Sequence, residues 1–183
     1  MPTLVKVIND VKTIEISSYN KLFTIDFKED YWIIPSLYDY PVSKDKIKNF
    51  LIGLSEIKTI EKKTNKPELF INLGVNDINK KDSVTKKVTL LNKEKEVLES
   101  FIYGLSGKTE GQNKTRYIRK SNENQSWLAW DNINVDDNII SWADTSFLPI
   151  KIYRIQNLLI EDVNNLEDIY VYRNSYDEQN FRI

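Results

Sequence analysis

One strongly periodic apolar stripe limits the folds that this chain can adopt. Apolar side chains recur every three or four positions at Ile47, Phe50, Leu51, Leu54, Ile57 and Ile60. This spacing predicts a helix with a face wide enough to cover a core. Ser43 follows a proline turn and can cap the helix, because its hydroxyl accepts from first-turn amides that have no partner within the helix.

Alternating apolar residues elsewhere predict strands for the stripe to cover. Three extended runs, at 5–16, 22–27 and 31–34, predict an antiparallel meander before the helix. Further elements are predicted as a short helix at 67–74, a hairpin at 87–103, strands at 117–119 and 126–130, and a short helix at 136–144. The pattern favours an α+β fold: an antiparallel sheet of meander strands covered by one main helix, with an irregular C-terminal part.

The C-terminal strands echo the N-terminal ones. The apolar positions Val11, Ile14, Ile16, Leu22, Ile25 and Phe27 each have an apolar counterpart 144 positions later, at Ile155, Leu158, Ile160, Leu166, Ile169 and Val171. Alternation alone does not fix this register, because any even shift of a strand preserves it. We therefore predict a first α+β unit over residues 1–153 and the opening strands of a second, related unit over 154–183, which can also pack as part of the same domain.

Composition limits the chemistry and the partners. The chain has 183 residues, 26 basic and 27 acidic, and a net charge of −1, so no overall field attracts nucleic acid and none is expected as a partner. It has no cysteine and no histidine, which removes disulfides, thiol chemistry and the commonest general base and metal ligand. No run reaches the ~20 apolar residues of a membrane span, so this segment is not expected to insert directly into a membrane.

Two local motifs suggest sites but lack the required spacing. Gly104 to Thr109 resembles a phosphate loop, yet that loop needs a glycine where this chain has Ile102. The Asp- and Asn-rich run from Asp131 to Asn138 lacks the alternating oxygens and central glycine of a calcium loop. We therefore predict no catalytic residue, no cofactor and no metal site. Carboxylates are nevertheless abundant, so a carboxylate-dependent hydrolase is kept as a second alternative.

Aromatic side chains are the remaining candidates for a binding surface. Trp130, Tyr38 and Trp127 are the predicted interaction residues. Trp127 and Trp130 lie three positions apart and so face opposite sides of a strand, where at most one can be core. Aromatics at strand spacing more often pack a sheet face than bind a ligand. A carbohydrate- or peptide-binding module using exposed aromatics is thus the first alternative function.

Several short runs occur together in an order that resembles one known family. They are Tyr40 to Ile47 with Leu51-x-x-Leu54, Thr64-x-x-Pro67 to Val75, Tyr117-Ile118-Arg119, Gln125 to Ala129, Ser141 to Asp144, and Arg154-Ile155. The ordered set resembles the bacterial domain-of-unknown-function family 4340. The resemblance implies an N-terminal membrane anchor and two related extracytoplasmic halves, in some members beside auxiliary parts of ABC-type transport systems such as those linked to gliding. It supplies no catalytic residue.

On this resemblance, we expect a non-catalytic, extracytoplasmic interaction or accessory module of a bacterial envelope or ABC-type transport complex. Its partners would be proteins of that complex. It would lie on the periplasmic side of the inner membrane, held by an anchor that this sequence does not include. Because the second unit ends before a covering helix, its strands have an open edge through which two copies could form a homodimer.

Overall fold

The computed structural model describes residues 7–79, 84–108, 114–131 and 133–146, and the backbone of three later strands. The chain divides into two compact units, Met1–Asp144 and Thr145–Ile183. The relation predicted between residues 154–183 and the first unit stays a prediction.

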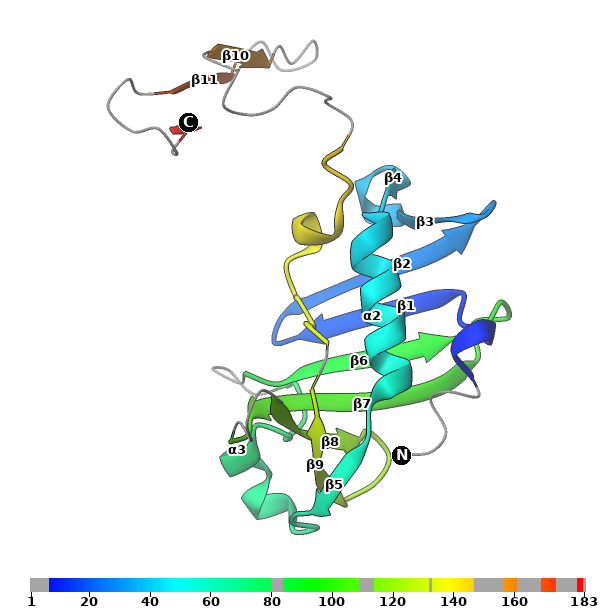
Figure 1. The fold of residues 1–183 in the computed structure, drawn as a ribbon, viewed down its shortest axis with the longest axis vertical. Coiled ribbons are helices and arrows are strands. Elements are labelled where there is room, and N and C mark those ends of the chain that lie inside the picture. The colour runs from blue at the N-terminus through cyan, green and yellow to red at the C-terminus, as the bar shows by residue number, and fades with distance from the viewer. Residues whose placement is uncertain are drawn as a thin grey trace. The chain divides into compact units, whose positions relative to one another are not determined.

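The first unit is built on a nine-stranded antiparallel sheet in the order β4-β3-β2-β1-β6-β7-β8-β9-β5 (Figure 1). The strands are β1 (Thr13–Ser18), β2 (Lys21–Lys28), β3 (Tyr31–Ile34), β4 (Tyr40–Pro41), β5 (Thr59–Lys62), β6 (Lys86–Leu91), β7 (Val97–Ser106), β8 (Thr115–Lys120) and β9 (Ser126–Trp130). The helices are η1 (Ile8–Asp10), η2 (Pro35–Leu37), α2 (Lys44–Glu56), η3 (Pro67–Leu69), α3 (Phe70–Leu73) and η4 (Ile139–Trp142). The predicted α+β class is confirmed. The predicted first strand is shorter than expected, because residues 8–10 form a 3-10 helix.

Helix α2 crosses one face of the sheet and covers the main core (Figure 1). Its buried residues Ile47, Phe50 and Leu54 belong to one apolar cluster with alternate residues of the central strands. The strand residues in this cluster include Ile14 and Ile16 of β1, Phe23 and Ile25 of β2, Val88 and Leu90 of β6, and Phe101 and Tyr103 of β7. The predicted stripe is therefore the covering face, although Ile60 lies in β5 and is 41% exposed.

The two ends of α2 follow from local chemistry. The Ser43 side chain accepts a hydrogen bond from the Lys46 backbone amide at 3.5 Å, which is the predicted cap. At the other end, Ile57 has an extended ψ angle that ends the helix, and the chain continues into β5. The helix thus joins the meander to the strand at the opposite edge of the sheet.

A smaller cluster occupies the other face of the sheet. Phe70 and Val75, at α3 and just after it, pack against Ile102 of β7. Gly104 permits this contact, because a Cβ there would lie 2.5 Å from the Leu73 carbonyl oxygen. The predicted short helix at 67–74 is thus observed as η3 followed by α3, and it covers the face that α2 does not.

The second unit contains a three-stranded antiparallel sheet in the order β10-β11-β12. Its strands are β10 (Asn157–Ile160), β11 (Ile169–Arg173) and β12 (Phe181–Arg182). In the first unit Ile14 pairs with Ile25. The offset of 144 positions would therefore pair Leu158 with Ile169, but Leu158 lies opposite Val171. The pairing is therefore shifted by two residues relative to β1 and β2, a shift that keeps the side-chain phase.

Replacing Leu54, which is fully buried, tests the role of α2. We expect Leu54→Ala to lower the free energy of unfolding by about 2–5 kcal/mol, because it leaves a cavity between helix and sheet. Ile52→Ala is the matched control, since Ile52 is 45% exposed on the same helix and should change stability by roughly 0.5 kcal/mol or less. Chemical denaturation measures both. Equal effects would contradict the role of α2 as the main covering element.

Candidate functional site

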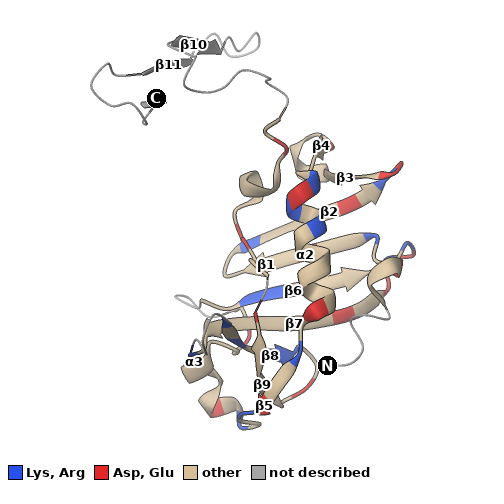
Figure 2. Cartoon of the chain, in the orientation of Figure 1, with Lys and Arg blue, Asp and Glu red and all other residues tan. Residues whose placement is uncertain are grey.

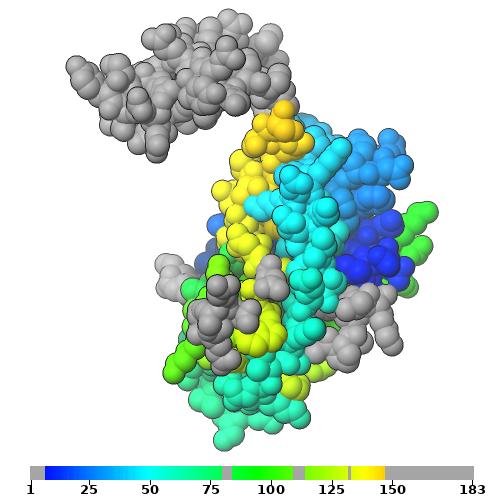
Figure 3. Space-filling view, viewed as in Figure 1, coloured from blue at the N-terminus to red at the C-terminus, as the bar shows by residue number. Residues whose placement is uncertain are grey.

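A segment that follows β9, residues 133–144 and called the strap below, lies beside α2 on the same face of the sheet (Figures 1 and 3). Trp142 of the strap is fully buried and meets Phe50 of α2 edge to face, with ring centroids 5.1 Å apart. Two backbone hydrogen bonds also join the strap to the turn before α2, from Ser43 to the Trp142 carbonyl at 2.8 Å and from Asp144 to the Pro41 carbonyl at 2.9 Å. The strap is therefore part of the core of the first unit.

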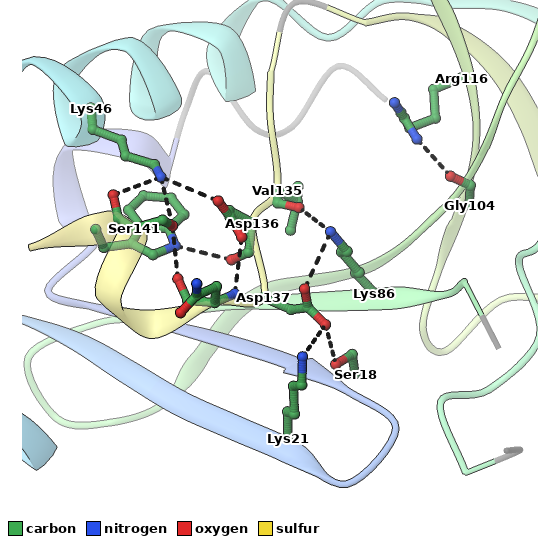
Figure 4. Close-up of polar contacts among 12 residues, drawn as sticks. Ser18, Lys21, Lys46, Lys86, Gly104, Arg116, Val135, Asp136, Asp137 and Ser141 are labelled. Carbon is green, nitrogen blue, oxygen red and sulfur yellow. Dashed lines mark hydrogen bonds and ion pairs between the residues drawn. The ribbon is translucent and has the colours of Figure 1, made fainter. Parts of the chain in front are cut away.

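Lys46 joins α2 to the strap through four contacts (Figure 4). Its ammonium donates to the carbonyl and hydroxyl oxygens of Ser141, both at 2.8 Å. It also lies 3.5 Å from a carboxylate oxygen of Asp136 and 4.9 Å from the ring centroid of Trp142. A single cation thus satisfies groups from three strap residues.

Asp137 joins the strap to the sheet (Figure 4). One of its oxygens accepts from the Ser18 hydroxyl at 2.8 Å and from the Lys21 ammonium at 3.3 Å. The other oxygen lies 3.6 Å from Lys86, which also donates to the Val135 carbonyl at 2.6 Å. Strands β1, β2 and β6 therefore all contribute to this joint.

The environments of Asp136 and Asp137 favour the charged form of each. Burial opposes ionisation of Asp137, but hydrogen bonding from Ser18 and the charges of Lys86 and Lys21 bring its pKa below the ordinary value. Burial likewise opposes ionisation of Asp136, and the backbone amide of Asn138, with Ser141 and Lys46, brings its pKa below the ordinary value. Both side chains therefore act as anionic anchors for the strap at neutral pH.

A second joint fixes the entry to the strap. Arg116 donates from Nε to the buried Asp131 carboxylate at 2.7 Å and from its terminal nitrogen to the Gly104 carbonyl at 2.9 Å. Its guanidinium stacks 4.4 Å from the ring centroid of Tyr103, whose hydroxyl hydrogen-bonds Asp131 and the Ile133 carbonyl. Burial and the neighbouring Asp131 raise the pKa of Tyr103, so the hydroxyl stays protonated as a donor. Arg116, Tyr103 and Asp131 therefore join β7 and β8 to the start of the strap.

A third joint centres on Arg119, which is 4% exposed. Its guanidinium donates to the Val75 carbonyl at 2.9 Å, the Glu123 carbonyl at 3.0 Å and the Asp77 carboxylate at 2.7 Å. It also lies 4.6 Å from the ring centroid of Phe70. The loop after α3 and the turn between β8 and β9 are therefore held by one planar cation.

The predicted interaction residues do not form one surface. Tyr38 is fully exposed after η2, near β3 and β4 at one edge of the sheet. Trp127 and Trp130 lie on β9, next to β5 at the opposite edge. Trp127 packs against the main core, with the Lys62 ammonium 5.5 Å from its ring centroid, and Trp130 is partly exposed. Their role in binding stays a prediction.

A different group of aromatics lines a groove beside the start of α2. The groove has a volume of about 450 Å³, and its lining residues are Phe27, Asp30, Tyr31, Trp32, Pro41, Val42, Lys44, Ile47 and Asp144. Phe27 and Trp32 meet edge to face at 5.4 Å, and Tyr31 is 44% exposed. We call this the aromatic groove. Its aromatics come from the adjacent strands β2 and β3. The sequence pattern predicted both strands, but it did not show that these side chains line one groove.

Neither a metal cluster nor a membrane-spanning helix is found in the part of the chain that the structure describes. No three Asp or Glu side chains there lie close enough to hold a metal ion. No helix there is long and apolar enough to cross a membrane.

Several of the runs that resemble a known family contribute to these joints. A family model described as Domain of unknown function (DUF4340) matches residues 32–181, most of the chain. The chain belongs to the DUF4340 family. No curated protein and no solved structure matches it. In this DUF4340 chain, Tyr40 to Ser43 contact Ser141 to Asp144, and the Ser126 hydroxyl donates to the Thr64 carbonyl at 2.6 Å.

The lowered pKa of Asp137 gives this DUF4340 chain a specific acid response. A carboxyl whose folded pKa is lowered stabilises the fold above its unfolded pKa, about 4, and loses that contribution as pH falls through the folded value. We expect Asp137→Asn to lower the free energy of unfolding by about 1–2 kcal/mol at pH 7, with the gap to the parent closing below about pH 4. Urea denaturation across pH measures this. Glu94→Gln, at an exposed turn, is the control and should leave the profile unchanged.

Proposed function

We propose that this chain is a non-catalytic, extracytoplasmic interaction or accessory module of a bacterial envelope or ABC-type transport complex. The observation that carries the proposal is that its buried and part-buried charged groups make structural contacts within the fold. Asp131, Asp137 and Arg119 each contact groups from distant parts of the chain, and so they hold loops and strap in place. Acidic and basic residues are otherwise interspersed over the first unit (Figure 2), as expected for a solvated surface.

The aromatic groove is the part of the first unit that best suits a protein partner. Tyr31 and Trp32 supply large apolar surfaces with few rotatable bonds, and Asp30 and Lys44 supply charges of both signs at the margin. An apolar aromatic centre with a polar rim is typical of protein interfaces. A groove of this kind is positioned rigidly, because its walls are strands β2 and β3 and the start of α2.

A carbohydrate or peptide ligand is the second candidate for the same groove. Aromatic faces stack on apolar faces of sugars and on peptide side chains, and Phe27, Tyr31 and Trp32 lie together here. Binding of a soluble oligosaccharide would change the tryptophan fluorescence of the parent, and the change would be lost in Tyr31→Ala. Such a result would favour the ligand-binding function over the protein partner.

Photo-crosslinking in the cells that encode the protein tests the interaction function. A benzoylphenylalanine residue at position 31 should give a discrete covalent adduct with one protein, because Tyr31 is exposed on the groove. The same residue at position 22 is the control, since Leu22 is 65% exposed on β2 and does not line the groove. The adduct protein should then co-purify with the parent and be lost with Tyr31→Glu but kept with Leu22→Glu. Absence of an adduct at position 31, or equal adducts at positions 31 and 22, would overturn the groove as the partner surface.

The proposed extracytoplasmic location rests on the family resemblance and can be tested separately. The sequence has no cysteine, so Tyr38→Cys places a single thiol at a fully exposed position. We expect a membrane-impermeant maleimide to label this variant once the outer membrane is permeabilised and the inner membrane is intact. The parent, treated in the same way, is the control and should not be labelled, because the sequence has no cysteine. Labelling only after the inner membrane is broken would contradict the location.

A further inference from the structure

A cleft of about 520 Å³ is lined by residues of β1 and β2 and of the loops beside them. Its lining residues are Lys12, Thr13, Asp26, Phe27, Lys28, Ile33, Pro35, Asp39, Asn92, Lys93 and Lys95. Thr13 and Asp26 are opposite each other on β1 and β2, and they alternate with Ile14 and Ile25, which face the α2 core. The loop after β3 and the turn between β6 and β7 supply other parts of the lining. We call this the lysine cleft.

The lysine cleft has an excess of positive charge. Lys28 pairs with Asp39 at 3.0 Å, and Lys95 pairs with Asp26 at 3.0 Å. The other two lysines, Lys12 and Lys93, have no carboxylate within ion-pairing distance in the described part of the chain. Four lysines against two aspartates therefore leave two cations for an anionic ligand.

The other lining groups restrict the class of that ligand. The Lys12 ammonium lies 4.2 Å from the ring centroid of Phe27, and Ile33 and Pro35 add apolar surface. One carboxylate oxygen of Asp26 is buried and has no hydrogen-bond partner among the described residues, although the other oxygen accepts from Lys95. That buried oxygen is out of reach of a ligand, so the charge and the apolar lining define the class: a ligand with carboxylates and apolar carbon.

We propose that the lysine cleft binds an acidic peptide segment of a protein partner. Carboxylates of the peptide pair with Lys12 and Lys93, and its apolar carbon packs against Phe27 and Pro35. A nucleic acid backbone or a phosphate-rich surface fits less well, because Phe27, Ile33 and Pro35 add apolar surface that a phosphodiester does not cover. The two aspartates also differ from the acid–base pair of a hydrolase, since each already accepts from a lysine. The inference rests on the proposed interaction function and names the chemistry of the partner.

Fluorescence anisotropy with two labelled octapeptides tests the proposal on the full chain. One peptide alternates Glu and Ala, and the other alternates Gln and Ala, so they differ in charge and hardly in shape. We expect the Glu peptide to bind at least about tenfold more tightly at low salt, and its binding to weaken as salt screens the charges. Lys12→Glu with Lys93→Glu should remove about tenfold or more of that affinity.

Two further variants make the outcome decisive. Lys48→Glu introduces the same charge change on the exposed side of α2 and should leave binding unchanged. Lys12→Gln with Lys93→Gln keeps the size of the side chains and should also weaken binding, which covers the case in which the Glu variants do not fold. Lys95 is left intact because it also donates to Thr13 at 2.6 Å.

Equal binding of the Glu and Gln peptides, or equal losses in the cleft and Lys48 variants, would overturn the lysine cleft as an acidic-peptide site. Lysine-dependent binding to phosphatidylglycerol vesicles without peptide binding would also overturn it, in favour of a membrane surface. If the peptide result fails while the Tyr31 adduct is still formed, the interaction function stands and the cleft assignment alone is wrong. If the peptide binds and no adduct forms at Tyr31, the lysine cleft stands as the partner surface and the assignment of the aromatic groove is wrong.

Discussion

The burial of α2 against the central strands is the contact on which the rest of the first unit depends. Ile47, Phe50 and Leu54 are almost completely removed from water, and burial of each such side chain contributes about 1.5–3 kcal/mol. The same helix presents Phe50 to Trp142 and Lys46 to the strap. Placing α2 therefore also places the strap, because the helix supplies both an apolar wall and a cation for it.

The polar joints depend on that apolar framework. Lys46, Asp137 and Arg119 act at short range and in partly buried positions, where a charge is costly unless its partners are already in place. Their partners belong to strands and loops that are far apart in sequence, such as Ser18 and Asp137 or Val75 and Arg119. The apolar core brings these segments together, and the joints then select one arrangement of the loops.

Local periodicity was enough to predict α2, its cap and the class of the fold, because helix and strand patterns depend on neighbours in sequence. The binding surfaces depend on strand order, which periodicity does not contain. Tyr38 and Trp127 looked alike as aromatic candidates, yet the sheet order places them near opposite edges. Lys12 and Lys93 showed no relation in the sequence, and they line one cleft only because β1 pairs with both β2 and β6.

The two faces of the sheet differ in a way that bears on how a partner could bind. The face under α2 is apolar, whereas the opposite face of the central strands is rich in hydroxyls. Thr89 and Ser100 hydrogen-bond at 3.0 Å there, and Ser100 contacts Ser121 at 2.9 Å. Among the described elements, η3 and α3 pack on this face near β7 and β8, away from the strands β1 and β2 that contribute to the lysine cleft. A partner at the lysine cleft would meet charged side chains beside the apolar surface of Phe27, Ile33 and Pro35. Charge-based contacts of this kind favour fast, salt-sensitive association over a permanent apolar interface.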